Sequence, residues 1–206
     1  MYIDEIKYLY KDNINQIRSI IEDIANALLG NPVSLVKTLK SIANAPFFIR
    51  EQLFWNKFFN FLNGIASSDD DLEKFRTKLS ENGTELENAM RLITLIDRAE
   101  TQKKVQYIIN ATMSLISDRI TLSSYFRICH SIIYTIDEDL LFMTAHIHED
   151  AIPMNIHVQG LMASGLMYYS SIPAMVKYYS FTEIAHLIDK YAITCDYHAR
   201  YPNSRV

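Results

Sequence analysis

The stretch IHVQGLMASGLMYYSSIPAMVKYYSFTEIAHLIDKYAI, residues 156–193, is the part of the sequence that decides the fold class. Its first third is an apolar segment that ends at Gly165, and glycine commonly follows the last turn of a helix. Two short β-prone runs come next, residues 168–170 and 176–179, with a proline between them. We therefore expect a helix that leads directly into a β-hairpin.

A second helix is expected directly after this hairpin. The sequence Ser-Phe-Thr-Glu at residues 180–183 is a capping box, and it predicts a helix over residues 181–191. Helix, hairpin and helix in this order are the outline of a winged-helix-like module, which we place at residues 151–195. The last residues, 196–206, are predicted to form a loose tail.

The preceding part of the chain, residues 1–150, is predicted to be a helical domain, which makes the protein mainly α. It contains few turn formers, because the whole chain has only five glycines and five prolines, too few for an all-β fold. We expect about eight helices in the chain. Before the module, helical spacing and capping signals mark helical segments near residues 3–30, 31–44, 48–62, 67–82, 84 onward, 101–116, 122–134 and 135–146.

Three details of these helices are specific enough to check. Asn63 and Gly64 are predicted to end the helix that starts at Phe48. Capping boxes that begin at Thr84 and Thr135 are predicted to start two later helices. The aromatic residues of 47–61 are expected to be mostly core, because only three charges interrupt them.

The charges are unevenly distributed, although the net charge is only −4. Residues 1–150 carry 16 basic and 21 acidic residues, residues 151–206 carry four and three, and residues 151–176 carry none. This is not the basic footprint of a nucleic-acid-binding protein. Polar residues and two prolines interrupt the uncharged run, so a transmembrane helix is not expected there.

The cysteines and the N-terminus favour a cytoplasmic protein. Cys129 and Cys195 are 66 positions apart and form no Cys-x-x-Cys motif. The N-terminal residues MYIDEIKYLYKD are charged and do not resemble a signal peptide. Cys129 lies in an apolar helical stretch and is expected to be a small buried hydrophobic residue.

A weak metal-binding signal is the group His146, His148 and His157. Imidazoles can bind zinc, but residues two apart on a helix point in different directions. The favoured interpretation is a solvated helix end, where histidine interacts well with the helix dipole. No metal or other cofactor is therefore expected, and the absence of phosphate-loop, Gly-x-Ser-x-Gly and His-Glu-x-x-His motifs gives no support for an enzyme.

Aromatic residues are the candidates for binding a protein partner, which could be a second copy of the chain. A membrane-acting effector that uses residues 34–65 is an alternative to a core role for the aromatic helix. The partner-binding candidates are Phe47, Phe48, Trp55, Phe58, Tyr168, Tyr169, Tyr178 and Tyr179.

A winged-helix transcription regulator is a further alternative. The polar residues of the module that could contact DNA are Asn155, His157, Gln159 and Lys177. Asn and Gln can contact base edges, but the basic residues that bind phosphates are nearly missing. The module is therefore expected to serve packing or dimerisation rather than DNA binding.

Two segments resemble a group of uncharacterised bacterial helical proteins from mobile-element and phage-defence gene neighbourhoods. The first is APFFIREQLFWNKFFNFLNGI, residues 45–65, and the second comprises GLMASGLMYYSS and YSFTEIAHLIDKYAI within residues 160–193. The resemblance implies a role in phage exclusion or prophage biology and carries no catalytic residues. We therefore expect a non-enzymatic, cytoplasmic protein-interaction factor that self-associates.

Overall fold

The computed structural model describes residues 22, 25–26, 28–30, 48–65, 69–81, 84–170 and 178–195. These parts of the chain form eight α-helices, one π-helix and three short strands. The α-helices are α3 (Phe48–Ile65), α4 (Asp69–Ser80), α5 (Glu85–Arg98), α6 (Gln102–Ile116), α7 (Leu122–Tyr134), α8 (Asp137–His146), α9 (Ile156–Ala163) and α10 (Glu183–Ile188). The strands are β1 (Ile152–Pro153), β2 (Met167–Ser170) and β3 (Tyr178–Phe181), and the π-helix is η1 (Asp189–Ile193).

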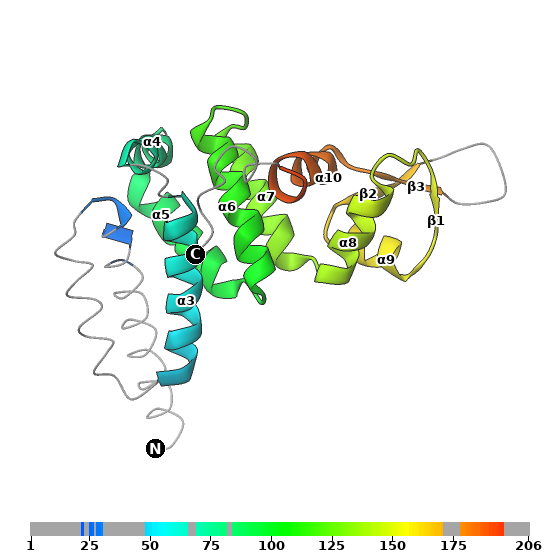
Figure 1. Cartoon of the computed structure of the whole chain (residues 1–206). Helices are drawn as coiled ribbons and strands as arrows, with labels where there is room; N and C mark the ends of the chain where they lie inside the picture. The colour runs from blue at the N-terminus through cyan, green and yellow to red at the C-terminus, as the bar shows by residue number, and fades with distance from the viewer. Residues whose placement is uncertain are drawn as a thin grey trace, which may run out of the picture.

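Helix α6 forms the centre of the molecule. It packs against α3 and α4 on one side and against α7 and η1 on the other, and nearly all of its residues are buried. Figure 1 shows α3, α4 and α5 at one end of the molecule, and α8, α9 and the strands at the other. A single hydrophobic core joins the two ends, with Phe58 and Phe75 at one and Leu161 and Phe181 at the other.

The predicted and observed helix bounds agree best for α7, because Leu122–Tyr134 is both the predicted and the observed range. The predicted end of α3 at Asn63 and Gly64 is wrong, because the helix continues to Ile65. Gly64 serves packing instead. A Cβ atom there would lie 2.7 Å from the Ile109 Cδ1 atom, so only glycine lets α3 and α6 approach this closely. Most of residues 1–47, with the predicted helices 3–30 and 31–44, lie outside the described residues.

Threonine side chains cap some of the helices but not all those predicted. Thr101 and Thr121 accept hydrogen bonds from the backbone N–H groups of the third residues of α6 and α7, as N-caps do. The capping boxes predicted at Thr84 and Thr135 are wrong, since neither side chain caps its helix. The Thr135 hydroxyl instead donates to the Ser131 carbonyl oxygen, 2.7 Å away, in the last turn of α7.

The strands form one small antiparallel sheet in the order β1-β3-β2. Residue 167 pairs with 181 between β2 and β3, and Ile152 pairs with Tyr179 between β1 and β3. The hairpin was predicted, with the end of its second strand two residues too early, but β1 was not. The chain is thus mainly α with a small three-stranded sheet. Among the helices described, none is both long enough and apolar enough to span a lipid bilayer.

Candidate functional site

Helix α9 is held in place at its N-terminus and along its inner side. Asn155 is the N-cap, and its side-chain oxygen accepts a hydrogen bond of 2.9 Å from the Val158 N–H. Val158 and Leu161 are fully buried and attach the helix to the core. At the other end, Gly165 has φ +74°, the left-handed conformation that ends helices, and the chain turns into β2.

The outer side of α9 is exposed and carries no charge. Ile156, Gln159, Met162 and Ala163 are its exposed residues. The spacing i, i+3, i+6 and i+7 places all four on one face of the helix. Ile156 is 79% exposed, the highest value among the large hydrophobic residues of the described segments. A helix face exposed to water normally carries charged residues, so this face is unusual.

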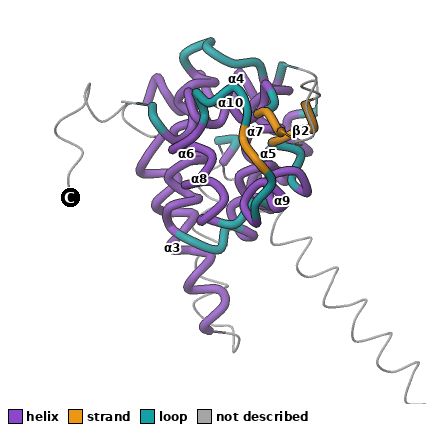
Figure 2. The backbone as a smooth tube through the Cα atoms, turned by 90° about the vertical axis from the view of Figure 1, so that its right-hand side faces the viewer, coloured by secondary structure: helices purple, strands orange, loops and turns teal. Residues whose placement is uncertain are grey.

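Exposed side chains without charge also occur just before α9 and in the strand that follows it. Tyr168 and Tyr169 of β2 are each 51% exposed, and Met154, just before α9, is 53% exposed. We call the exposed side chains of Met154, Ile156, Gln159, Met162, Tyr168 and Tyr169 the uncharged surface. Figure 2 looks onto the end of the molecule that carries α9 and the sheet.

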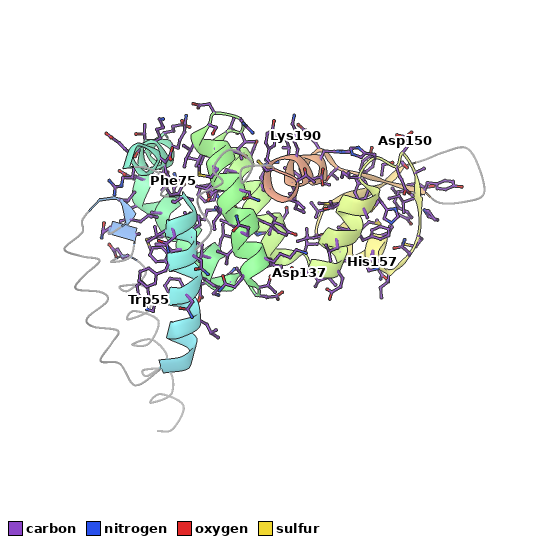
Figure 3. The ribbon with its side chains drawn as sticks, in the orientation of Figure 1. Trp55, Phe75, Asp137, Asp150, His157 and Lys190 are labelled. Carbon is purple, nitrogen blue, oxygen red and sulfur yellow. The ribbon has the colours of Figure 1, made fainter. Side chains whose placement is uncertain are left out.

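A buried carboxylate fixes the inner side of α9 to α8. The Oδ1 atom of Asp139 lies 2.9 Å from the Nδ1 atom of His157, and the Asp139 side chain is almost fully buried. The His157 ring stacks on Phe142 of α8 at 4.8 Å. Gly160 leaves room for the carboxylate, because a Cβ atom there would lie 1.9 Å from Asp139 Oδ2. Figure 3 labels His157 at this end of the molecule.

The Asp139–His157 hydrogen bond links α8 to α9. Carboxylates that orient the Nδ1 atom of a histidine also occur in catalytic sites, where the other ring nitrogen acts on a nucleophile. Within the described segments, however, His157 forms its hydrogen bond with Asp139 and with no serine, threonine or cysteine. Sequence reasoning noted Asp139 by residue type alone and did not connect it with His157. The signal that could have found it is Gly160, an isolated glycine in an apolar helix, which often marks close packing.

The structure does not bring the three candidate metal ligands together. His146 bonds Glu149 through Nδ1 at 2.6 Å, whereas His157 bonds Asp139. His146 and His157 both contact the Phe142 ring. In the part of the chain that the structure describes, no three His, Cys, Asp or Glu residues form a group that could hold a metal ion.

The third of these histidines, His148, lies near a different carboxylate, at the junction of α10 and η1. Burial raises the pKa of Asp189 above its ordinary value of 3.8, and the charges of His148 and His186 oppose this shift. The Oδ1 atom of Asp189 is buried and has no hydrogen-bond partner among the described residues.

A π-helix often marks a functional site, but the carbonyl oxygens of η1 accept hydrogen bonds from two residues of α6. Asn110 donates to the Ala192 oxygen at 2.7 Å, and Ser114 donates to that of Tyr191 at 3.2 Å.

The aromatic partner-binding candidates divide into buried and exposed residues. Trp55 and Phe58 of α3 and Tyr179 of β3 belong to the core, which removes them as surface contacts. Tyr178 is half-buried, whereas Tyr168 and Tyr169 are exposed. Phe47 and the side chain of Phe48 lie outside the described part. Figure 3 shows Trp55 at the opposite end of the molecule from His157.

The same burial bears on the membrane-acting alternative. Of residues 34–65, the structure describes α3, and the apolar side chains of Phe58, Phe61 and Ile65 are fully buried in the core. Among the described side chains of α3, the exposed large hydrophobic ones are Leu53 and Phe59. The described part of this segment therefore uses most of its apolar surface for packing.

The DNA-contact candidates are also placed differently from one another. The Asn155 side chain caps α9 and His157 bonds Asp139, so both have roles within the protein. Gln159 is exposed, and Lys177 lies outside the described residues. Among the described residues after 150, Lys190 is the one Lys or Arg.

Comparisons with known proteins identify no relatives. The chain matches no protein-family model, no curated protein and no solved structure.

Proposed function

We propose that this protein is a non-enzymatic interaction factor that binds a protein partner through its uncharged surface. One observation carries the proposal. The described residues include ten exposed large hydrophobic side chains, and five of them lie between residues 154 and 169. The same sixteen positions contain no Asp, Glu, Lys or Arg. Grouped exposed apolar residues on a folded domain commonly mark a contact with another molecule.

The type of partner follows from the chemistry of this surface. Nucleic acids and anionic membranes are attracted by Lys and Arg, which are missing here. A protein surface of aromatic and methionine side chains matches the core composition of protein–protein interfaces. The rigid attachment of α9 by Asn155, Val158 and Leu161 supports the proposal, because a preorganised helix costs little entropy on binding.

The setting that we propose is phage defence or prophage biology in the cytoplasm. It rests on the resemblance of residues 45–65 and 160–193 to bacterial proteins of such gene neighbourhoods. We also propose a winged-helix-like unit over α9, β2, β3 and α10, because a helix leads into a hairpin and a helix follows. Its role would be protein binding, since Asn155 and His157 are engaged internally.

The proposal is tested by site-specific photo-crosslinking in cells. A photoreactive amino acid replaces Ile156 or Met162 in the full chain, and Leu53 serves as the control. Leu53 is an exposed apolar residue on α3, at the other end of the molecule (Figure 1). We expect one defined crosslinked protein from positions 156 and 162 and none from position 53. Equal crosslinking from all three positions, or none from 156 and 162, would contradict the proposal.

A further inference from the structure

Helices α5 and α7 lie side by side and are joined by two contacts between their side chains. The Arg91 guanidinium of α5 lies 4.3 Å from the centre of the Phe126 ring of α7. One helical repeat further along, the Arg98 Nη1 atom donates a hydrogen bond to the Tyr134 hydroxyl. Because the residue numbers of both contacts increase together, the two helices run in the same direction.

The exposed side of this helix pair is basic. Arg91 and Arg98 are exposed on α5, and the spacing i and i+7 places them on one face of the helix. Arg127, His130 and Tyr134 are exposed on α7 at i, i+3 and i+7, which is again one face. We call these five side chains the arginine surface. Its charge contrasts with the net charge of −4 of the whole chain.

Neutral groups, rather than carboxylates, hold the arginines of this surface. Arg91 lies over the Phe126 ring, and Arg98 bonds the Tyr134 hydroxyl, so both guanidinium groups are oriented and keep their full charge. Helix α7 contains no Asp or Glu, and Asp97 of α5 points about 100° around the helix from Arg98. Among the described residues, no ion pair involves the three arginines. Oriented guanidinium groups of this kind are suited to bind carboxylates or phosphates of another molecule.

The size of the arginine surface restricts the kind of anion that it can bind. Arg91 and Arg98 are about 10.5 Å apart along the helix axis. Exposed carboxylates follow beyond both ends, Glu87 before Arg91 and Glu100 after Arg98. A nucleic acid would continue past this short region and meet those charges, and its binding commonly uses about six to ten phosphate contacts. A short anionic segment with few charges fits the surface better.

Apolar side chains at one end of the arginine surface favour a protein as the source of this segment. Tyr134 is 52% exposed, and Ile136, two residues further along the chain, is 54% exposed. Tyrosine and arginine are enriched in protein–protein interfaces. We propose that α5 and α7 bind an acidic segment of a protein partner, with its carboxylates on Arg91 and Arg98 and an apolar side chain on Tyr134 and Ile136. This inference goes beyond the proposed function and does not rest on it, because it concerns a different surface.

Fluorescence anisotropy with synthetic peptides tests the inference on the full chain. The probe is a labelled peptide of about twenty residues built from Glu-Leu-Glu-Glu repeats, and the control peptide has Gln in place of every Glu. We expect the protein to bind the acidic peptide at about 50 mM salt and to lose at least about tenfold in affinity at about 500 mM salt. The control peptide should not bind. Equal binding of the two peptides, or no binding of either, would overturn the inference.

Charge-removing substitutions show whether the peptide binds at α5 and α7. We expect Arg91→Gln to weaken binding at least about threefold, and the double variant Arg91→Gln/Arg98→Gln at least about tenfold. Lys190→Gln is the matched control, because Lys190 is exposed and also lies over an aromatic ring, that of Tyr191, at 5.0 Å. Equal losses from Arg91→Gln and Lys190→Gln would contradict binding at the arginine surface. The circular dichroism spectrum of each variant reports whether the fold is kept.

A labelled single strand of about fifteen thymidines distinguishes a protein partner from a nucleic acid. We expect this strand to bind more weakly than the acidic peptide. Tighter binding of the strand, lost in the double arginine variant, would assign the arginine surface to nucleic acid and overturn the protein partner. Crosslinking from positions 156 and 162 uses a surface without either arginine, so it tests the proposed function separately from this inference.

Discussion

The Nδ1 atom of His157 lies 2.9 Å from the Oδ1 atom of Asp139, and this contact joins α9 to α8. Asp139 is 5% exposed, so its carboxylate depends on partners within the protein. Replacing His157 by Ala leaves a buried acceptor without its partner, which typically costs about 1–3 kcal/mol. We expect His157→Ala to lower the free energy of unfolding by this amount in urea titrations. His148→Ala removes an exposed histidine and should change it by less than about 0.5 kcal/mol. Equal effects of the two substitutions would show that the Asp139–His157 hydrogen bond contributes nothing to the free energy of unfolding.

Gly160 should be intolerant of alanine, although alanine usually stabilises helices by about 1 kcal/mol relative to glycine. The new Cβ atom would lie 1.9 Å from Asp139 Oδ2, so α8 and α9 would have to separate. Overpacking of this kind costs about 1–3 kcal/mol. We expect Gly160→Ala to lower the melting temperature in the wild-type background and to be much less harmful in an Asp139→Ala background. The same loss in both backgrounds would mean that the carboxylate is not the obstacle.

The two cysteines should differ strongly in reactivity. Burial raises the pKa of the Cys129 thiol from its ordinary 9.0 to about 12, and the side chain is fully buried. Cys195 is half-buried. Because the thiolate is the reactive form, we expect one thiol to react with a disulfide reagent at pH 8 in the native protein and the second only after unfolding. Cys195→Ser should abolish the first reaction, and a fast reaction that persists in this variant would contradict the burial of Cys129.

Asp189 should make the protein less stable as the pH rises. Burial raises its pKa in the folded state above 3.8, so the folded state binds the proton more tightly than the unfolded state. Stability from this group is therefore full below about pH 3.8 and is lost as the pH rises through the folded-state pKa. We expect Asp189→Asn to raise the melting temperature at pH 7, by at most a few degrees because the side chain is only half-buried. The gain should vanish near pH 3.5, and a gain that is independent of pH would contradict this origin.

Helices that depend on local signals were the most predictable part of the fold. α7 has its predicted bounds, because Thr121 caps it and the apolar residues follow a helical period. The end of α3 was misassigned because Gly64 does not end the helix. It makes room for the side chain of Ile109, which lies 45 positions further along the chain. β1 was missed because two residues carry no periodicity, and it forms only by pairing with β3.

The candidate site was partly predictable for similar reasons. Tyr168 and Tyr169 were identified from composition, and the structure exposes both. Ile156 and Met162 were not identified, because an apolar helix residue is usually buried and the sequence alone does not show which face stays open. The Asp139–His157 pair joins residues 18 positions apart on two helices, so no spacing rule connects them.

The most direct test of the uncharged surface is the effect of a single charge on partner binding. Ile156→Glu introduces a carboxylate at an exposed position of α9, where the fold should tolerate it. Crosslinking from position 162 is measured in this variant and in Leu53→Glu, which places the same charge on α3. We expect Ile156→Glu to reduce the amount of crosslinked complex at least about tenfold, because binding would bury an unpaired charge in the interface. Leu53→Glu should leave the amount of complex unchanged. An undiminished complex in Ile156→Glu would show that α9 is not the binding surface.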